Sequence, residues 1–294
     1  MTLFEDQIKH YRKQAGLSQE KMAEKIGVSR QAITKWENGT GTPDISNLMA
    51  IANLFQLSID ELLSNEKTES KKSEYIYESR TEYDIDGKKD FDIKLGGAYK
   101  VDLKAYNGEK IVVELFSNVY KNIQSDYKVK IDDIRHNIDI ELARLNGVSE
   151  AIAKESLVVN INIPAKYIGR VEISVNAGIL TVNDIENENI EINGKISEVA
   201  LKGNKSEIEI DSNLDMQINV ISHEGAVEIN QLSATSRLII SENFCFRSAK
   251  KGIANTIYYE KYGKKVESFS NDESDNYIEL NGIKSELVIA IDEA

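Results

Sequence analysis

The chain is poor in cysteine, proline and long apolar runs. Its 294 residues include one cysteine, Cys245, and two prolines. One cysteine excludes an internal disulfide, and the chain lacks the run of about 18 apolar residues that a membrane-spanning helix needs. The first residues, MTLFEDQIKHYRKQ, have no apolar signal core. We therefore expect a cytoplasmic globular protein that makes no contact with a membrane.

Positive charge is scarce, and what there is lies unevenly. Lys and Arg number 36 against 49 Asp and Glu, so the net charge is −13. Residues 1–65 contribute −1 of this and residues 66–294 contribute −12. The acidic part should be repelled by a polyanion, whereas the N-terminal part can present a basic face if Arg12, Lys13, Arg30 and Lys35 cluster.

Residues 4–63 place apolar side chains at helical spacing, as Ile33 and Trp36 illustrate. The pattern predicts five helices, near 4–14, 18–25, 29–37, 44–55 and 59–63. The expected N-caps are Ser18, Ser29, Asp44 and Ser58, and the expected helix-ending glycines are Gly16 and Gly39. These elements form a small all-α domain over residues 1–65.

The next segment, Ser64 to Ser73, reads SNEKTESKKS and contains no apolar side chain. Such a composition is typical of a solvated linker. We place the linker at residues 66–74 and the second domain at 75–294, which agrees with the two domains that the length suggests.

From about Glu74 the apolar period changes from 3.6 to 2, which predicts an all-β domain. Alternating segments occur at 91–95, 101–105, 128–131, 138–142 and 159–163. Four Asn-Gly pairs, at 107–108, 146–147, 193–194 and 281–282, are expected to form tight turns. Residues 277–291 are expected to form the closing strands, preceded by a polar loop at 268–276.

Beyond Pro164 the strands follow a regular cadence of 9 to 11 residues. Their expected centres are Ile173, Val182, Glu191, Ala200, Glu209, Ile218, Glu228 and Ile239. Two strands per coil would make a β-solenoid, which we prefer, and a β-sandwich is the alternative because its strands are spaced similarly.

Residues 17–39, LSQEKMAEKIGVSRQAITKWENG, contain two short helical stretches joined by a turn at 26–29. The residue pattern of one family agrees with this segment at four places: Leu17-Ser18-Gln19, Met22-Ala23, Gly27-Val28-Ser29 and Ile33-Thr34-Lys35-Trp36-Glu37-Asn38-Gly39. The segment resembles the XRE/Cro-type helix-turn-helix transcriptional regulators. The match extends through Pro43-Asp44, Leu48, Ile51-Ala52 and Leu57.

The resemblance implies a second helix that enters the major groove of DNA. Ser29, Arg30, Gln31, Thr34 and Lys35 would project from this helix. Arg30 or Gln31 would read a base edge, because Arg pairs with guanine and Gln with adenine. Phosphate contacts would come from Thr34, Lys35, Asn38, Arg12 and Gln19, the last at a helix N-terminus that attracts anions.

The sequence shows no catalytic or metal-binding signature. His10, His136 and His223 lie far apart, without the spacing of metal ligands. We therefore expect no enzyme, metal or cofactor, and we expect Cys245, between Phe244 and Phe246, to be buried. The region from about 90 to 291 resembles the putative-adhesin type of β-solenoid domain, which carries no catalytic residues to transfer.

These features predict a sequence-specific DNA-binding transcriptional regulator, a repressor acting as a homodimer on operator DNA. Its β domain would dimerise or bind a protein or small-molecule signal. The alternative is a structural protein in which the β-solenoid polymerises and the helical domain tethers it to DNA.

Overall fold

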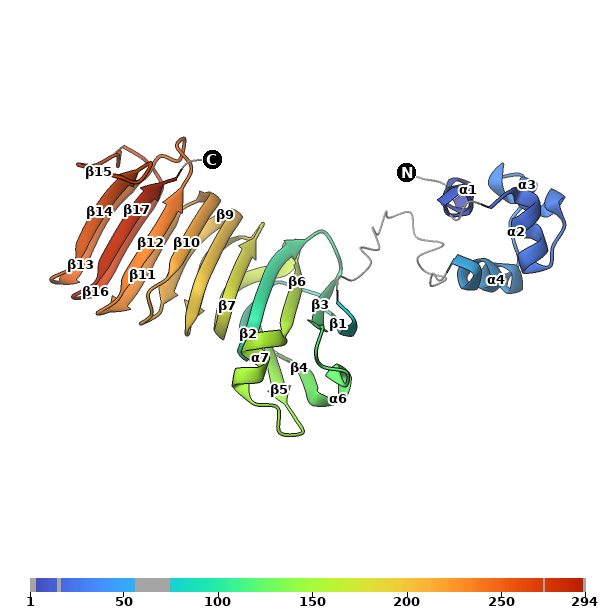
Figure 1. The fold of residues 1–294 in the computed structure, drawn as a ribbon, viewed down its shortest axis with the longest axis horizontal. Helices are drawn as coiled ribbons and strands as arrows, with labels where there is room; N and C mark the ends of the chain where they lie inside the picture. Colours follow the sequence, from blue (N-terminus) through green and yellow to red (C-terminus); the bar gives the residue numbers. More distant parts are fainter. Residues whose placement is uncertain (1–3, 15–16, 56–74, 272, 293–294) are drawn as a thin grey trace. The chain divides into compact units, whose positions relative to one another are not determined.

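The computed structural model describes residues 4–14, 17–55, 75–271 and 273–292, and the chain divides into two compact units at residues 74 and 75 (Figure 1). We describe each unit by itself. The predicted linker, the predicted helix at 59–63, Ser58 and Gly16 lie outside the described residues.

Four helices make up the described part of the N-terminal unit: α1 (Phe4–Gln14), α2 (Gln19–Ile26), α3 (Arg30–Glu37) and α4 (Ile45–Phe55). Three of the predicted N-caps are confirmed. The side-chain oxygens of Ser18, Ser29 and Asp44 accept hydrogen bonds from backbone N–H groups three residues on. Each bond satisfies a donor that the first helical turn leaves free.

The helices enclose a small apolar core. Its buried members are Ile8, Met22, Ala23, Ile33, Trp36, Ile51 and Ala52. Ala23 of α2 is 3% exposed, and α2 and α3 pack against each other.

The second unit is mainly β, with 17 strands in one hydrogen-bonded network. In chain order they are β1 (Tyr77–Asp84), β2 (Lys89–Tyr106), β3 (Lys110–Ser117), β4 (Tyr127–Ile134), β5 (Asn137–Arg144), β6 (Val158–Pro164), β7 (Ile168–Asn183), β8 (Glu186–Asn193), β9 (Ile196–Asp211), β10 (Gln217–Glu224), β11 (Ala226–Leu232), β12 (Thr235–Ile240), β13 (Arg247–Ile253), β14 (Thr256–Lys261), β15 (Lys264–Val266), β16 (Tyr277–Ile283) and β17 (Glu286–Ile291).

The prediction of an all-β domain was wrong in one respect, because this unit also contains the short helices α6 (Ile123–Asp126) and α7 (Glu150–Ser156) and the 3-10 turn η1 (Ala165–Tyr167). Ser149 caps α7 by accepting a hydrogen bond from the Ile152 N–H. Ala153 of α7 is buried, and the helix packs against β2.

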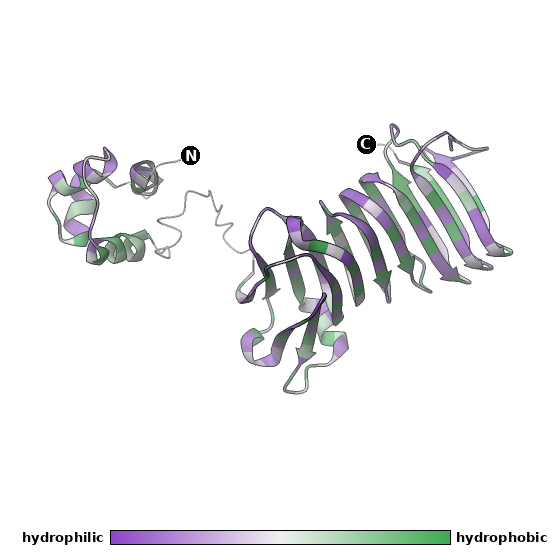
Figure 2. Ribbon diagram, turned by 180° about the vertical axis from the view of Figure 1, so that it is seen from behind, coloured by the Kyte–Doolittle hydropathy of each residue, from purple (hydrophilic) through white to green (hydrophobic). Residues whose placement is uncertain are grey.

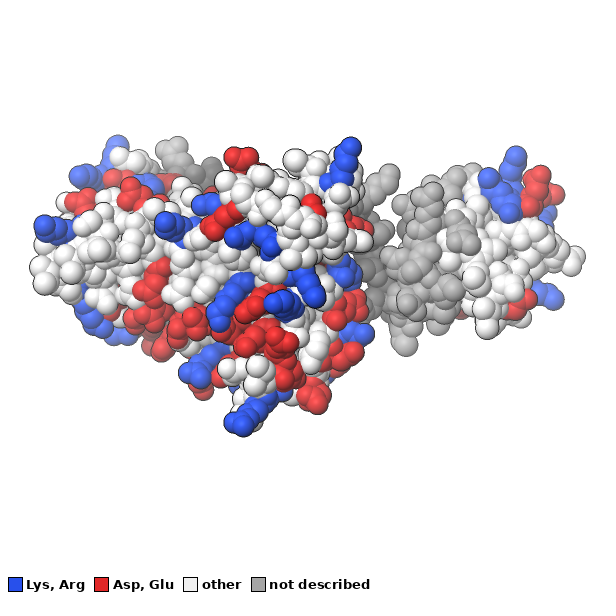
Figure 3. All heavy atoms as spheres, turned by 90° about the horizontal axis from the view of Figure 1, so that it is seen from below, with Lys and Arg blue, Asp and Glu red and all other residues white. Residues whose placement is uncertain are grey.

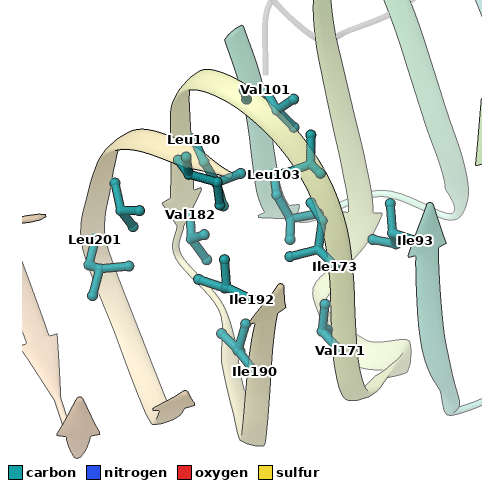
Figure 4. Close-up of a cluster of buried hydrophobic side chains, with 14 of the residues drawn as sticks. Ile93, Val101, Leu103, Val171, Ile173, Leu180, Val182, Ile190, Ile192 and Leu201 are labelled. Carbon is teal, nitrogen blue, oxygen red and sulfur yellow. The ribbon is translucent and has the colours of Figure 1, made fainter. Parts of the chain in front are cut away.

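All eight predicted strand centres lie within strands, but β7 and β9 each contain two of them. The first half of β7 pairs with β8, and its second half pairs with β9. Most pairings in this part of the sheet are parallel with a nearly constant step: Leu180 pairs with Val199, and Val199 pairs with Ile218, each 19 residues on. Apolar residues alternate with polar ones along the strands (Figure 2), and the apolar residues are the buried ones. The buried side chains of successive steps lie together in one core (Figure 4).

The last strands in the chain are not the last in the sheet. β16 lies between β11 and β13, and β17 lies between β12 and β14, all in parallel register. Residues 247–266, for which we predicted no strands, therefore form the final β13, β14 and β15 at the end of the sheet (Figure 1).

The prediction of tight turns is confirmed for Asn146-Gly147, where φ is +49° and +76° and the Val148 N–H donates to the Leu145 carbonyl at 3.0 Å. It was wrong for Asn281-Gly282. Gly282 instead lies within β16 with φ +153°, where an added Cβ would stand 1.8 Å from the Gln231 carbonyl oxygen of β11. Gly194 makes the same close approach to the Val175 carbonyl, at 2.0 Å. These glycines permit neighbouring strands to pack closely.

The prediction that Cys245 is buried was wrong. Cys245 is exposed, whereas Phe246 is fully buried and Phe244 is half-buried. The two aromatic rings occupy the core side of this extended segment, so the residue between them faces outward.

Acidic side chains form a column across consecutive strands of the second unit. The parallel register aligns, in order, Asp139, Asp92, Glu172, Glu191, Glu209, Glu228 and Glu279. Burial and the neighbouring carboxylates raise the pKa of Glu228. Figure 3 shows acidic side chains gathered on one face of this unit.

His223 of β10 is 5% exposed, and burial lowers its pKa below the usual value. His223 therefore takes up a proton near pH 6.5 in the unfolded chain but only at lower pH in the folded chain. The free energy of unfolding falls as the pH falls through that range. We expect His223→Gln to remove this part of the pH dependence, by up to about 1.4 kcal/mol per pH unit, in denaturant unfolding measured between pH 7.5 and 5. His136→Gln, at an exposed position, is the control and should retain the full slope.

Within the described residues, no helix is both long and apolar enough to cross a membrane.

Candidate nucleic-acid interface

The turn between α2 and α3 lies where the sequence predicts it. α2 ends at Ile26, and Gly27 follows in a left-handed conformation with φ +74°. The Val28 N–H donates to the Ala23 carbonyl at 3.0 Å, and Ser29 then caps α3. A residue with a Cβ would be strained at Gly27, which explains why glycine ends α2.

α3 has one buried and one exposed face. Ile33 and Trp36 are 0% and 6% exposed and anchor the helix in the core. Arg30, Gln31 and Lys35 are exposed, and Thr34 is half-buried. The helix therefore presents its polar residues on a rigid support.

Both ends of α3 are fixed by capping interactions, and the exposed Ser29 and Asn38 flank it. At its C-terminus, Gly39 has φ +67°, and the Thr40 N–H donates to the Lys35 carbonyl at 2.9 Å. This is the Schellman arrangement, with Gly39 at the left-handed position expected from the sequence.

Glu37 joins α1, α2 and α3 through buried hydrogen bonds. Its carboxylate accepts from Arg12 Nε at 2.5 Å, from Arg12 Nη2 at 3.0 Å and from Gln19 Nε2 at 2.8 Å. Arg12 Nη1 also donates to the Leu17 carbonyl at 2.7 Å. The Glu37 side chain is 1% exposed and that of Arg12 is 11% exposed. We call Arg12, Gln19 and Glu37 the Glu37 network.

The network keeps Glu37 ionised. Burial alone would raise the pKa of Glu37, but the hydrogen bonds from Arg12 and Gln19 outweigh it and lower the pKa. The hydrogen bond to Glu37 correspondingly raises the pKa of Arg12. A buried charge that is paired and hydrogen-bonded in this way avoids the cost of an isolated one.

The eight candidate residues thus fall into two groups. Arg30, Gln31 and Lys35 share the exposed side of α3, with Ser29 and Asn38 at its ends. Arg12 and Gln19 both bind Glu37 on the buried face of α3. Thr34 Oγ1 donates a hydrogen bond to Gln19 Oε1 at 3.2 Å.

Sequence reasoning missed Glu37 itself. A signal was present, because Ile33, Trp36 and Glu37 lie three and four residues apart and therefore on one face of α3. An acidic residue on the buried face needs a cationic partner.

Two short helices joined by a glycine turn, with an anchored second helix that exposes a polar face, define a helix-turn-helix DNA-binding domain. Residues 8–62 match the helix-turn-helix family. Over 64 residues the chain is 44% identical to the HTH-type transcriptional activator BcrR of Enterococcus faecalis, covering 22% of this chain and 31% of that protein. It is 36% identical to the uncharacterized HTH-type transcriptional regulator MJ0272 of Methanocaldococcus jannaschii, covering 22% of this chain and 97% of that protein.

Two solved structures are also similar. The P22 c2 repressor bound to a synthetic operator is 32% identical, with 22% of this chain and all of that chain covered and a TM-score of 0.22. A putative adhesin from Bacteroides fragilis is 10% identical, with 74% of this chain and 97% of that chain covered and a TM-score of 0.37.

The chain belongs to the helix-turn-helix family, of the XRE type, and its N-terminal unit is a DNA-binding transcriptional regulator domain. The C-terminal unit resembles putative-adhesin domains.

Proposed function

We propose that the chain is a dimeric repressor that reads operator DNA with α3. The carrying observation is the exposed start of this helix, where Arg30 and Gln31 stand on a core-anchored support. A side chain on a rigid helix can hold the bidentate geometry that base recognition requires. Occupying a site that overlaps a promoter is enough to repress it.

The remaining exposed residues suit the phosphate backbone. Ser29, Thr34, Lys35 and Asn38 surround the reading positions and can donate to phosphate oxygens. Gln19 opens α2, where free N–H groups and the helix dipole favour an anion. Because three of the Arg12 nitrogens already bind Glu37 and Leu17, we propose that Arg12 acts on DNA chiefly by holding Gln19 in place.

We expect Arg30→Ala and Gln31→Ala each to lose about 1–3 kcal/mol of discrimination between the preferred operator and a site altered at one base pair. The preferred operator is first selected from a random DNA pool. Fluorescence anisotropy with matched and altered duplexes then measures the discrimination.

Lys35→Ala is the matched control on the same helix. It should weaken binding to all sequences alike and lower the salt dependence of binding, because a phosphate contact carries no base information. If Arg30→Ala and Gln31→Ala both keep the wild-type sequence preference, the assignment of α3 as the reading helix fails.

A dimer follows from the size of the reading surface. One such helix contacts only a few base pairs, so two copies on half-sites about one helical turn apart are needed for specificity. Relatives include an activator and a repressor, so in vitro transcription from an operator-bearing promoter decides the direction, with less transcript expected.

We infer that the β unit is a β-solenoid rather than a sandwich, with a role in dimerisation or in sensing a protein or small-molecule signal. The constant parallel step of about 19 residues supports this inference, because stacked coils give parallel in-register neighbours, whereas sandwiches are built mainly from antiparallel strands.

The alternative of a polymerising filament is less well supported. Among the described strands, β13 pairs with β16 alone and leaves one edge open. That edge strand carries Arg247, Lys250 and Lys251. Positive charges on an edge strand oppose edge-to-edge addition of another copy.

A further inference from the structure

Positive charge is concentrated in the strands at the end of the β unit, β13, β14 and β15. Residues 247–266 contain six Lys and Arg residues and one acidic residue, Glu260, which gives a net charge of +5. Residues 66–294 as a whole carry −12. The six cations are Arg247, Lys250, Lys251, Lys261, Lys264 and Lys265. An otherwise acidic unit therefore ends in a basic surface (Figure 3), and we call residues 247–266 the basic end.

The basic end is the last layer of the sheet. Among the described strands, β13 pairs with β16 on one side only, and β15 pairs with β14 on one side only. Ser248 of β13 and Tyr259 of β14 share a hydrogen bond across the layer. Phe269 packs against Phe246 and Tyr259. The layer therefore closes the apolar core, and no described strand covers its outer side.

Closing the core requires polar residues at this layer, but not positive ones. Lys250 pairs in register with Leu280, and Lys261 pairs with Ile291, so lysines stand where the preceding strands have buried apolar residues. A polar outer face on the last repeat keeps a stacked fold soluble. Any polar side chain supplies such a face, and Asp and Glu outnumber Lys and Arg in this chain by 49 to 36. The accumulation of cations therefore indicates an anionic partner.

Four of the six cations are not neutralised by a neighbouring carboxylate. Lys251 Nζ lies 2.8 Å from Glu279 Oε1, and Lys261 Nζ lies 2.6 Å from Glu242 Oε1. The remaining four are exposed and form no ion pair within the described residues: Arg247, Lys250, Lys264 and Lys265. Their charges are therefore available to a ligand in solution.

Tyrosine rings hold several of these cations at the surface. The distances from the cation to the ring centroid are 5.3 Å for Arg247 and Tyr277, 5.0 Å for Lys265 and Tyr258, and 5.4 Å for Lys261 and Tyr262. An aromatic face attracts a cation without cancelling its charge. The rings therefore restrict the side chains and leave their N–H groups able to donate to an anion.

We propose that the basic end binds the phosphate backbone of DNA without reading its sequence. This inference rests on the proposed function, which brings operator DNA to the same chain. The four unpaired cations are spread over β13 and β15, which suits the repeated charges of a polyanion better than one small anion. Phosphate contacts of this kind add affinity and orientation but no sequence recognition. The acidic remainder of the unit is repelled by DNA, so the basic end is the surface that approaches it.

The salt dependence of DNA binding tests the proposal in the full chain. The variant Lys250→Gln/Lys264→Gln/Lys265→Gln removes three unpaired charges. Each phosphate contact contributes about 0.9 to the slope of log K against log salt concentration, so this variant should lower the magnitude of the slope by about 2–3. Fluorescence anisotropy measures the slope between about 50 and 200 mM salt, on an operator duplex flanked on both sides by unrelated DNA.

The matched control is Lys121→Gln/Lys128→Gln/Lys130→Gln. It removes three exposed lysines of the same unit that lie outside the basic end, so the net charge of the chain changes equally. The control should keep the wild-type slope, and far-ultraviolet circular dichroism should show both triple variants folded like wild type. An equal slope in the two triple variants overturns the proposal.

An anionic membrane surface is the competing partner for the same charges. Sedimentation with vesicles of phosphatidylserine and phosphatidylcholine distinguishes it from DNA, and wild type should remain in the supernatant at about 0.15 M salt. Vesicle binding that the Lys250→Gln/Lys264→Gln/Lys265→Gln variant loses would assign the basic end to a lipid surface and overturn the proposal.

A duplex of random sequence separates this inference from the proposed function. The difference in slope between the two triple variants should appear on that duplex too, because every sequence presents the same phosphates. If Arg30→Ala and Gln31→Ala keep the wild-type sequence preference, the reading role of α3 fails. A difference in slope on the random duplex would still support the basic end.

Discussion

Arg12→Ala is expected to destabilise the helical unit by about 3 kcal/mol or more. The substitution leaves the Glu37 carboxylate, 1% exposed, without the cation that accounts for two of its hydrogen bonds. Removing one partner of a buried ion pair costs about 3–5 kcal/mol because the other charge stays desolvated. Urea unfolding followed by tryptophan fluorescence measures the loss, since Trp36 is the only tryptophan and lies in this unit's core.

Two further variants serve as controls for Arg12→Ala. Lys13→Ala changes an exposed cation next to Arg12 and should alter stability by no more than about 0.5 kcal/mol. The double variant Arg12→Met/Glu37→Leu should recover much of the loss, because no unpaired charge remains. Equal stability of Arg12→Ala and Lys13→Ala would show that the Glu37 network does not hold the three helices together.

Gly282→Ala is expected to destabilise the β unit by several kcal/mol. The new Cβ would lie 1.8 Å from the Gln231 carbonyl oxygen, and the φ of +153° is one that side-chain-bearing residues rarely adopt. Because β16 lies between β11 and β13, the clash must push apart strands that pair on both sides. Thermal unfolding followed by far-ultraviolet circular dichroism should show the β transition at a clearly lower temperature.

Gly87→Ala serves as the matched control, because a Cβ at Gly87 would meet no atom within 4 Å. Its β transition should stay within the range of ordinary surface substitutions, about 0.5 kcal/mol. The urea transition of Trp36 should be unchanged in both variants, since the two units are separate compact bodies. A Gly282→Ala protein as stable as Gly87→Ala would contradict the close strand approach.

The sequence predicted the elements of the helical unit well because the signals there are local. Ser18, Ser29 and Gly39 act within three or four residues of their own positions, so their roles can be read from spacing. The buried state of Trp36 followed from helical periodicity in the same way. Glu37 was missed because its partners, Arg12 and Gln19, are brought to it by the packing of three helices.

In the β unit, alternation located the strands but could not order them. Nothing in residues 277–291 indicates that they insert between β11–β12 and β13–β14, since the order is set by pairing across the whole sheet. β13 was overlooked because four of its seven residues, at 250–253, are exposed in succession, which hides the period of two. For Gly282 the sequence signal was real, but the partner that requires glycine is the distant Gln231 carbonyl.

The acidic column gives the two units opposite responses to ionic strength. Added salt screens the repulsion between carboxylates that stand one above another, such as Glu209, Glu228 and Glu279, and so favours the folded β unit. The same salt weakens DNA binding by the helix-turn-helix unit, because counterions compete for the phosphates. A rise in salt is therefore expected to release the helix-turn-helix unit from DNA while it stabilises the fold of the β unit.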